Sequence, residues 1–228
     1  MIVRALYAAI FAGVLAGLAV SAVHFTKLVP LIIEAETYEN GAPHEDAGAT
    51  PAHVPVPVGA EPADLSRTVL TIVANLITGM GFALLLAAAM LFSGRAISLR
   101  SGAVWGLAGF LVVSLAPALG LAPELPGMPA GDLVARQVWW VATVAASAGG
   151  GWLVVFSRNA ALKALGVALV FLPHLIGAPQ PESHASDVPA GLAAAFAAGS
   201  LGASAIFWLV LGSASGWLLG RDDKLRAA

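Results

Sequence analysis

The side chains of this sequence that are best suited to chemistry are a few histidines and carboxylates near the ends of long apolar stretches. Neutral imidazole is a common ligand of divalent transition metals, and carboxylates complete sites for borderline-hard ions. Five residues are the candidate metal ligands: His24, Glu34, Glu36, Glu124 and His174. His24 and Glu34 are ten residues apart, about 15 Å along one helix, so they cannot bind one ion unless the helix bends. The spacing therefore predicts a polar vestibule more strongly than a closed metal site.

Each candidate ligand also has a structural interpretation, which the sequence leaves open. His24 could bond to a carbonyl of a neighbouring helix, and His174 could cap a kinked helix end. Glu34 and Glu36 could form an ordinary acidic rim. The remaining histidines are typical of solvated loop residues: His44, His53 and His184.

Signatures of enzymes and of nucleic-acid binding are absent from the sequence. There is no HExxH helix, no Walker A loop and no GxGxxG turn. The run Gly202-Ala203-Ser204 is faintly similar to an intramembrane serine protease motif, but no histidine follows it to act as the base. The absence of cysteine excludes thiolate metal sites, and a net charge of −2 gives no electrostatic case for nucleic acid. We therefore expect neither an enzyme nor a nucleic-acid-binding protein.

The composition predicts a protein embedded in a membrane. Hydrophobic residues make up 59% of the 228 residues and charged residues only 11%, whereas soluble domains carry about 25% charged residues. Crossing roughly 30 Å of hydrocarbon takes about 20 apolar residues, and lipid offers backbone groups no hydrogen-bond partner, which favours helices. We expect one all-α membrane domain over 1–228, a bundle of six transmembrane helices at about 5–29, 68–92, 101–121, 136–156, 161–177 and 194–219. The first is expected to be a retained helix rather than a cleaved signal peptide.

The charges predict how the six spans are oriented. Under the positive-inside rule, eight of the eleven Lys and Arg residues lie on the cytoplasmic side, which places both termini inside: Arg4, Arg95, Arg100, Arg158, Lys163, Arg221, Lys224 and Arg226. All five histidines and nearly every acidic residue then lie outside. The only long connection, residues 34–66, is an outer loop that we expect to be partly flexible.

Small and polar residues inside the spans indicate how the helices pack. Three rows have small residues four positions apart, which lets helix backbones approach closely in lipid: Gly13, Gly17 and Ser21; Gly102 and Gly106; and Gly212, Gly216 and Gly220. They indicate a tight bundle or a subunit contact. Asn75 either links two helices or has a function, because polar groups inside a membrane are functional candidates by default. Arg136 could pair with Glu124 or Asp132 at the outer surface.

Four segments resemble one known family. They are LVPLIIEAETYE at 28–39, LAPALGLAPELPGMPAGDLVARQVWW at 115–140, LPHLIGAPQP at 172–181 and AIFWLVLG at 205–212. Together they are similar to the bacterial cobalt transporter subunit CbtA family, over nearly the whole chain apart from 41–60. The family has more histidines in its first loop than the His44 and His53 of this chain.

The resemblance implies a function in cobalt uptake at the bacterial inner membrane, often for cobalamin synthesis. It implies Co²⁺ as the transported ion rather than a resident cofactor. The implied partners are the lipid bilayer, a small single-span subunit with a histidine-rich tail (CbtB) and other membrane subunits. It draws attention to a set of residues near the outer face: Glu34, Glu36, Glu124, Arg136, His174 and Gln180. The competing hypothesis is a non-catalytic structural or accessory subunit of a larger membrane complex, which the Gly and Ala rows suit equally well.

Overall fold

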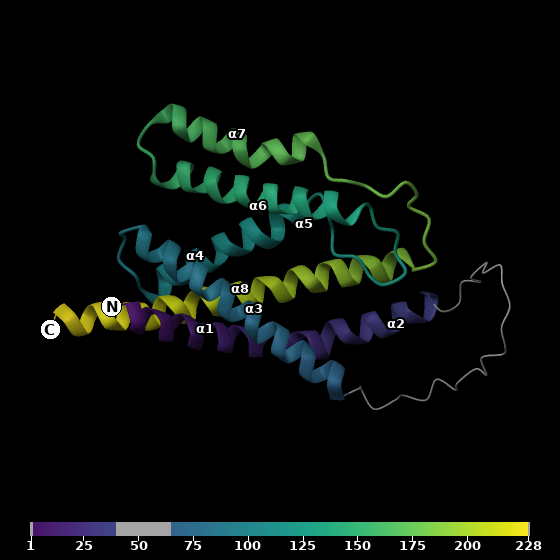
Figure 1. Ribbon diagram of the computed structural model, residues 1–228, viewed down its shortest axis with the longest axis horizontal. Helices are drawn as coiled ribbons and strands as arrows, with labels where there is room; N and C mark the ends of the chain where they lie inside the picture. Colours follow the sequence, from purple (N-terminus) through teal and green to yellow (C-terminus); the bar gives the residue numbers. More distant parts are fainter. Residues whose placement is uncertain (1, 40–64, 228) are drawn as a thin grey trace.

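The helices of the computed structural model, which describes residues 2–39 and 65–227, form six rods (Figure 1). Two of the rods contain a π-helical turn, labelled η. The helices are α1 (Ile2–Val23), η1 (His24–Leu28), α2 (Val29–Glu39), α3 (Leu65–Phe92), α4 (Leu99–Gly109), η2 (Phe110–Leu115), α5 (Ala116–Ala118), α6 (Leu133–Phe156), α7 (Ala160–Ile176) and α8 (Ala190–Ala227). No strand occurs in the described ranges. The prediction of an all-α fold is therefore confirmed.

Five of the six rods are long and apolar enough to cross a membrane. They are Val3–Tyr38, Leu65–Phe92, Leu99–Ala118, Leu133–Phe156 and Ala190–Arg221. The sixth, α7, is apolar but has 17 residues, about 25 Å of helix against roughly 30 Å of hydrocarbon. Five spans of the predicted six thus have the required length, and the crossing by α7 stays a prediction.

The first rod is longer than the sequence predicted. It continues past Pro30 to Glu39, so residues 34–39 are helical and do not begin the expected outer loop at 34. The reason is the π-turn before Pro30, in which the N–H of Val29 donates to the carbonyl of His24, five residues back. A wider turn accommodates the proline ring, which otherwise clashes with the carbonyl four residues earlier. The rest of that loop, including His44 and His53, lies outside the described residues.

A second π-turn precedes Pro117. There the N–H of Ala116 donates to the carbonyl of Leu111, so that η2 lies directly before the proline. This rod ends at Ala118, three residues before the predicted end at 121. The other predicted ends differ by at most four residues, and those at 92 and 156 coincide, except that α8 continues to Ala227, well beyond 219. A π-turn thus precedes Pro30 and Pro117, whereas α7 contains Pro173 without one.

Glycines bring the helix backbones into contact, as their spacing predicted. Gly13 and Gly17 of α1 lie on the backbone of α3, where a Cβ added to Gly13 would be 2.6 Å from the Cα of Met80. Gly102 and Gly106 of α4 meet Gly212 and Gly216 of α8 in the same way. Two further contacts were missed: Gly79 on α3 faces Gly13, and Gly150 of α6 faces Gly166 of α7.

The helices group into two units. The first contains α1, α3, α4 and α8, which pack through the contacts of α1 with α3, α1 with α8 and α4 with α8. The second is the hairpin of α6 and α7, drawn at the top of Figure 1. In the part of the chain that the structure describes, neither α6 nor α7 makes a backbone contact with α8, and the hairpin meets the first unit through η2 and α5.

An aromatic cluster joins the two units near the chain termini. Trp105 of α4 lies 6.1 Å from Phe156 of α6 between ring centroids, and Trp152 stacks on Phe156 at 4.3 Å. The guanidinium carbon of Arg95 lies 4.4 Å from the centroid of the Phe156 ring. The hairpin is therefore attached at both ends and separated from α8 between them.

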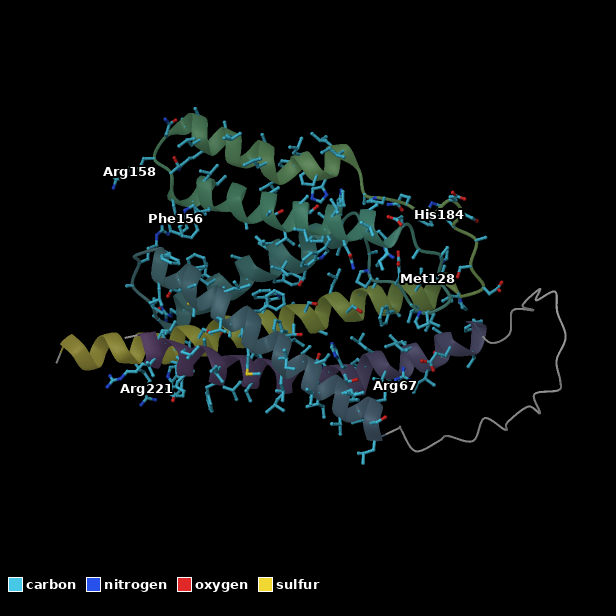
Figure 2. All side chains as sticks on the ribbon, in the orientation of Figure 1. Arg67, Met128, Phe156, Arg158, His184 and Arg221 are labelled. Carbon is cyan, nitrogen blue, oxygen red and sulfur yellow. The ribbon has the colours of Figure 1, made fainter. Side chains whose placement is uncertain are left out.

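The two ends of the bundle differ in charge. Both termini lie at one end, together with Arg158 and Arg221, whereas Arg67, Met128 and His184 lie at the other (Figures 1 and 2). The second end also contains Glu124 and Asp132, in the connection 119–132, and Glu182 and Asp187, in the connection 177–189. We call it the acidic end and its opposite the basic end. This separation agrees with the sorting of charges that the sequence predicted.

The glycine contacts predict that one substitution on α8 destabilises the protein while another on the same helix does not. Gly212→Val would place a side chain on the backbone of Gly102 and Gly106, whereas nothing lies within 4 Å of a Cβ at Gly202. Overpacking costs about 2 kcal/mol, which lowers the thermal midpoint in detergent by roughly 4–8 °C for a chain of this size. Gly202→Val should leave the midpoint unchanged or slightly raised. Equal midpoints for the two variants would contradict the α4–α8 contact.

Candidate functional site

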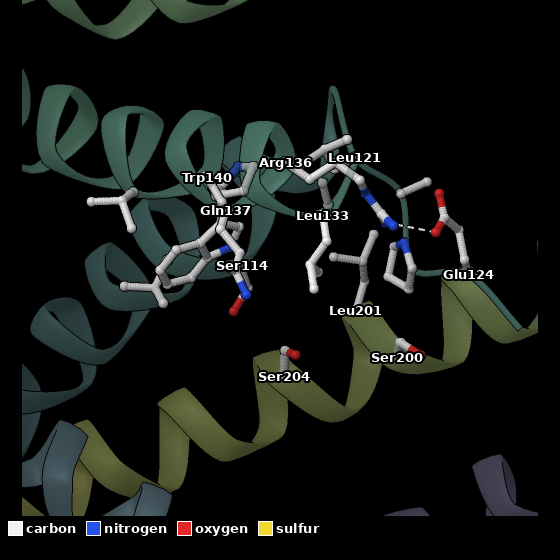
Figure 3. Close-up of a pocket in the computed structure, with 16 residues that line it drawn as sticks. Ser114, Leu121, Glu124, Leu133, Arg136, Gln137, Trp140, Ser200, Leu201 and Ser204 are labelled. Carbon is white, nitrogen blue, oxygen red and sulfur yellow. Dashed lines mark hydrogen bonds and ion pairs between the residues drawn. The ribbon is translucent and has the colours of Figure 1, made fainter. Parts of the chain in front are cut away.

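A cleft lies where α6 and α8 do not touch. Its volume is about 720 Å³, and its back wall is formed by η2 and α5 while residues 121–124 cover its acidic end. Most of its wall is apolar. Its polar side chains come from four segments and are drawn in Figure 3: Ser114, Glu124, Arg136, Gln137, Ser200 and Ser204.

An ion pair stands at the mouth of this cleft. Arg136, on the first turn of α6, donates from Nη2 to Oε2 of Glu124 at 2.6 Å, and about a quarter of each side chain is exposed. Asp132, the alternative partner of Arg136, instead caps α6 by accepting from the N–H of Ala135 at 2.8 Å. The charges of Glu124 and Arg136 therefore neutralise each other at the entrance.

The connection that carries Glu124 is fixed on both sides. Leu125 is 3% exposed and packs with Ala35 of α2 and with Val188 and Leu192 near the start of α8. On the hairpin side, Gln180 donates from Nε2 to the carbonyl of Gly120 at 3.3 Å. Gln180 thus ties two outer connections together, which gives this residue a structural role.

His24 takes part in a polar contact between α1 and α3. Asn75 Nδ2 donates to Ser21 Oγ at 3.0 Å and lies 3.2 Å from His24 Nδ1. Ser21 donates its own proton to the carbonyl of Gly17 at 2.8 Å, so its oxygen accepts from the amide. With the amide donating, His24 Nδ1 accepts, and the ring is neutral with its proton on Nε2. The partner of His24 is therefore a side-chain amide, not the backbone carbonyl that one interpretation expected, and Asn75 links two helices.

The contacts of the other candidate ligands do not involve His24. Glu36 accepts from Arg67 Nη2 at 2.9 Å, which links α2 to α3, and Glu34 is exposed on α2. His174 of α7 meets Trp139 of α6 edge to face, with 5.9 Å between ring centroids. It does not cap the helix, because Gly177, at a φ of 89°, ends α7 by donating to the carbonyl of Pro173.

The structure does not bring the five candidate ligands together. Among the residues described, no three His, Asp or Glu side chains are placed to hold one metal ion. A ligand role for each of them stays a prediction. The sequence analysis missed Gln137 and Ser200, and it considered Ser204 only as part of a protease motif. No signal in the sequence could have found them, because small polar residues in apolar helices are common and only the fold shows that these three face one space.

Comparison with protein families gives the chain its family. The model of a family described as "Probable cobalt transporter subunit (CbtA)" matches residues 2–220, nearly the whole chain. Searches of curated proteins and of solved structures found no match. The five apolar helices of spanning length agree with a multi-pass membrane protein. This chain therefore belongs to the CbtA family of cobalt transporter subunits.

Proposed function

We propose that this chain is the membrane subunit of a cobalt uptake transporter that captures Co²⁺ at its acidic end. The observation that carries the proposal is the gathering of carboxylates and imidazoles at the end opposite the termini, beside a cleft that enters the bundle. Fixed negative charge raises the local concentration of a divalent cation. Carboxylate and imidazole are also the ligands that suit Co²⁺.

The charge distribution supports an orientation for this capture. Cytoplasmic loops of membrane proteins carry an excess of Lys and Arg, and Arg95, Arg158 and Lys163 lie at the basic end. We therefore place both termini in the cytoplasm and the acidic end in the periplasm of a bacterial inner membrane, with α7 as the sixth span.

Capture and transfer would use different groups. Glu34 and Glu36 lie in the outer half of α2, and Glu124 lies at the cleft. His24 and His174 supply imidazole nearer the membrane. Because each makes separate contacts, an ion would bind to one or two at a time, which suits transport, since a transported ion must also leave. Energy and further ligands would come from partner subunits, among them a single-span subunit with a histidine-rich tail of the CbtB type. The chain itself would not act as an enzyme.

A structural accessory subunit is the second candidate, and one observation favours it. Three of the five candidate ligands already have structural partners: Glu36 with Arg67, Glu124 with Arg136, and His24 with Asn75. In a subunit of that kind these contacts would hold the bundle together, and their loss would change assembly without changing metal binding.

Cysteine labelling tests the orientation, because the natural chain has no cysteine. Ser183→Cys, in the connection 177–189, should react with a membrane-impermeant maleimide added outside intact cells. Ser157→Cys, between α6 and α7, should react only after permeabilisation. Reaction of both positions from the same side would overturn the six-span orientation.

Removal of the two imidazoles nearest the membrane tests the capture pathway. His24→Ala with His174→Ala should lower cobalt accumulation by about tenfold or more, because lost metal-site interactions cost 10–100-fold in affinity. His184→Ala, in an exposed outer connection, should retain accumulation and serves as the control. Unchanged accumulation in the double variant, at wild-type expression, would remove both histidines from the pathway.

The ion pair at the cleft predicts that loss of its carboxylate lowers cobalt uptake. Glu124→Gln leaves the guanidinium of Arg136 without its carboxylate beside the cleft, so cobalt uptake should fall on the order of tenfold, about 1.4 kcal/mol. Adding Arg136→Gln removes the repulsion, and uptake should recover in part. Initial uptake rates of radioactive cobalt measure both variants. A double variant no better than Glu124→Gln alone would show that electrostatic repulsion plays no part.

A further inference from the structure

We infer that the cleft between α6 and α8 holds the transported divalent cation inside the membrane with its water shell still bound. The inference rests on the proposed function and assigns a binding compartment to it. The groups that bind would be neutral oxygens from three elements: Ser114 of η2, Gln137 of α6, and Ser200 and Ser204 of α8.

Three of these side chains lack a hydrogen-bond partner among the residues that the structure describes. Within residues 2–39 and 65–227, no group hydrogen-bonds to Gln137, Ser200 or Ser204. Some hydroxyl groups of the helices donate to the carbonyl four residues earlier, as Ser21 does to Gly17 and Thr143 to Trp139, both at 2.8 Å. Ser147 of α6 and Ser215 of α8 also have no partner among the described residues, but both are buried and neither lines the cleft. Ser200 and Ser204 are partly exposed instead, and both face the cleft (Figure 3).

The position of these groups argues for a ligand. Ser204 is 14 residues from the start of α8, about 20 Å along the helix, and therefore deep in the predicted span. An unpaired hydroxyl or amide costs free energy in an apolar environment. Polar side chains inside a membrane mostly face a bundle interior or a water-filled cavity and mark the paths of substrates and ions. The cleft matches this pattern, because its polar groups converge from separate helices on one space.

The chemistry of the lining selects a hydrated ion. A bare transition-metal ion needs several imidazole or carboxylate ligands in direct contact, and the only carboxylate here, Glu124, is paired with Arg136. A hydrated ion instead donates hydrogen bonds through its water, which serine and glutamine oxygens accept. Six waters at about 30 Å³ each occupy roughly 180 Å³. The cleft, at about 720 Å³, is large enough for this shell.

Trp208 does not line the cleft itself but contacts Ser114, which does. Its Nε1 donates to Ser114 Oγ at 3.2 Å, and its ring, 4% exposed, packs against Phe82 at 5.1 Å between centroids. A Cβ added to Gly109 would meet this same ring, so α4 also closes on it. The helices are therefore closely packed behind Ser114.

The test uses single cysteines in the full chain, expressed with its partner subunits in cells. Ser204→Cys should react with a water-soluble, impermeant thiol reagent from the acidic side, and millimolar Co²⁺ should slow the reaction several-fold. Gly202→Cys, two residues away with nothing within 4 Å of its Cβ, is the control and should react only with a lipid-soluble maleimide. If Ser204→Cys reacts only with the lipid-soluble reagent, the cleft is filled by lipid or by a partner helix and the inference is wrong. The absence of protection by Co²⁺ would also overturn it.

If Ser204→Cys does not fold, cobalt uptake by alanine variants tests the same inference. Ser200→Ala with Ser204→Ala should lower cobalt uptake by about tenfold, whereas Ser213→Ala, which faces an apolar groove with Leu99 and Trp217, should not. Normal uptake by the double variant would remove the cleft from the path while leaving the proposed function intact. Failure of the wild type to take up cobalt would overturn the proposed function itself. The labelling of Ser204→Cys does not depend on uptake, so it would still show whether water reaches position 204.

Discussion

The fold depends on the close approach of helix backbones at glycine. In lipid, burial of apolar side chains gives helices little reason to associate, so they depend on packing and on hydrogen bonds between them. Gly13 with Gly79, Gly106 with Gly212, and Gly150 with Gly166 supply such packing. Because the contact of Gly150 with Gly166 lies within the α6–α7 hairpin, it does not attach that hairpin to the other helices. The two units and the cleft between them follow from where the glycines lie.

Polar side chains inside the helices have two kinds of surroundings. At the contact of α1 with α3 they pair with each other, as Asn75 does with Ser21 and His24, and such pairs add to packing. Where the units stand apart, polar groups of α6 and α8 face the space between them without a partner in the described chain. We interpret the first as structure and the second as the place where the transported ion is held. The ion pair of Glu124 and Arg136 stands at the boundary and keeps the entrance neutral.

The fold class and the helix contacts were predictable from the sequence because both leave local patterns. Apolar stretches predicted the helices, and the spacing of Gly102, Gly106, Gly212 and Gly216 predicted close backbone contacts, though not which helices make them. The passage of helix through Pro30 was not predictable, because it depends on a π-turn, which has no clear sequence pattern. The cleft was not predictable either, since it depends on which helices fail to meet. The five candidate ligands were chosen by residue type, and type alone does not show that Glu36 is paired with Arg67 while Ser200 faces a cavity.

The central claim, that this membrane subunit of the CbtA family moves cobalt through its acidic end, is tested most directly by reconstitution. The measurement is the entry of radioactive Co²⁺ into proteoliposomes down an imposed gradient, with the purified chain alone and with its partner subunit. The account predicts entry that saturates with cobalt concentration and that Ca²⁺ inhibits much less than Ni²⁺, since imidazole and carboxylate together favour transition metals. Vesicles that admit no more cobalt than protein-free ones, with or without the partner, would contradict the account.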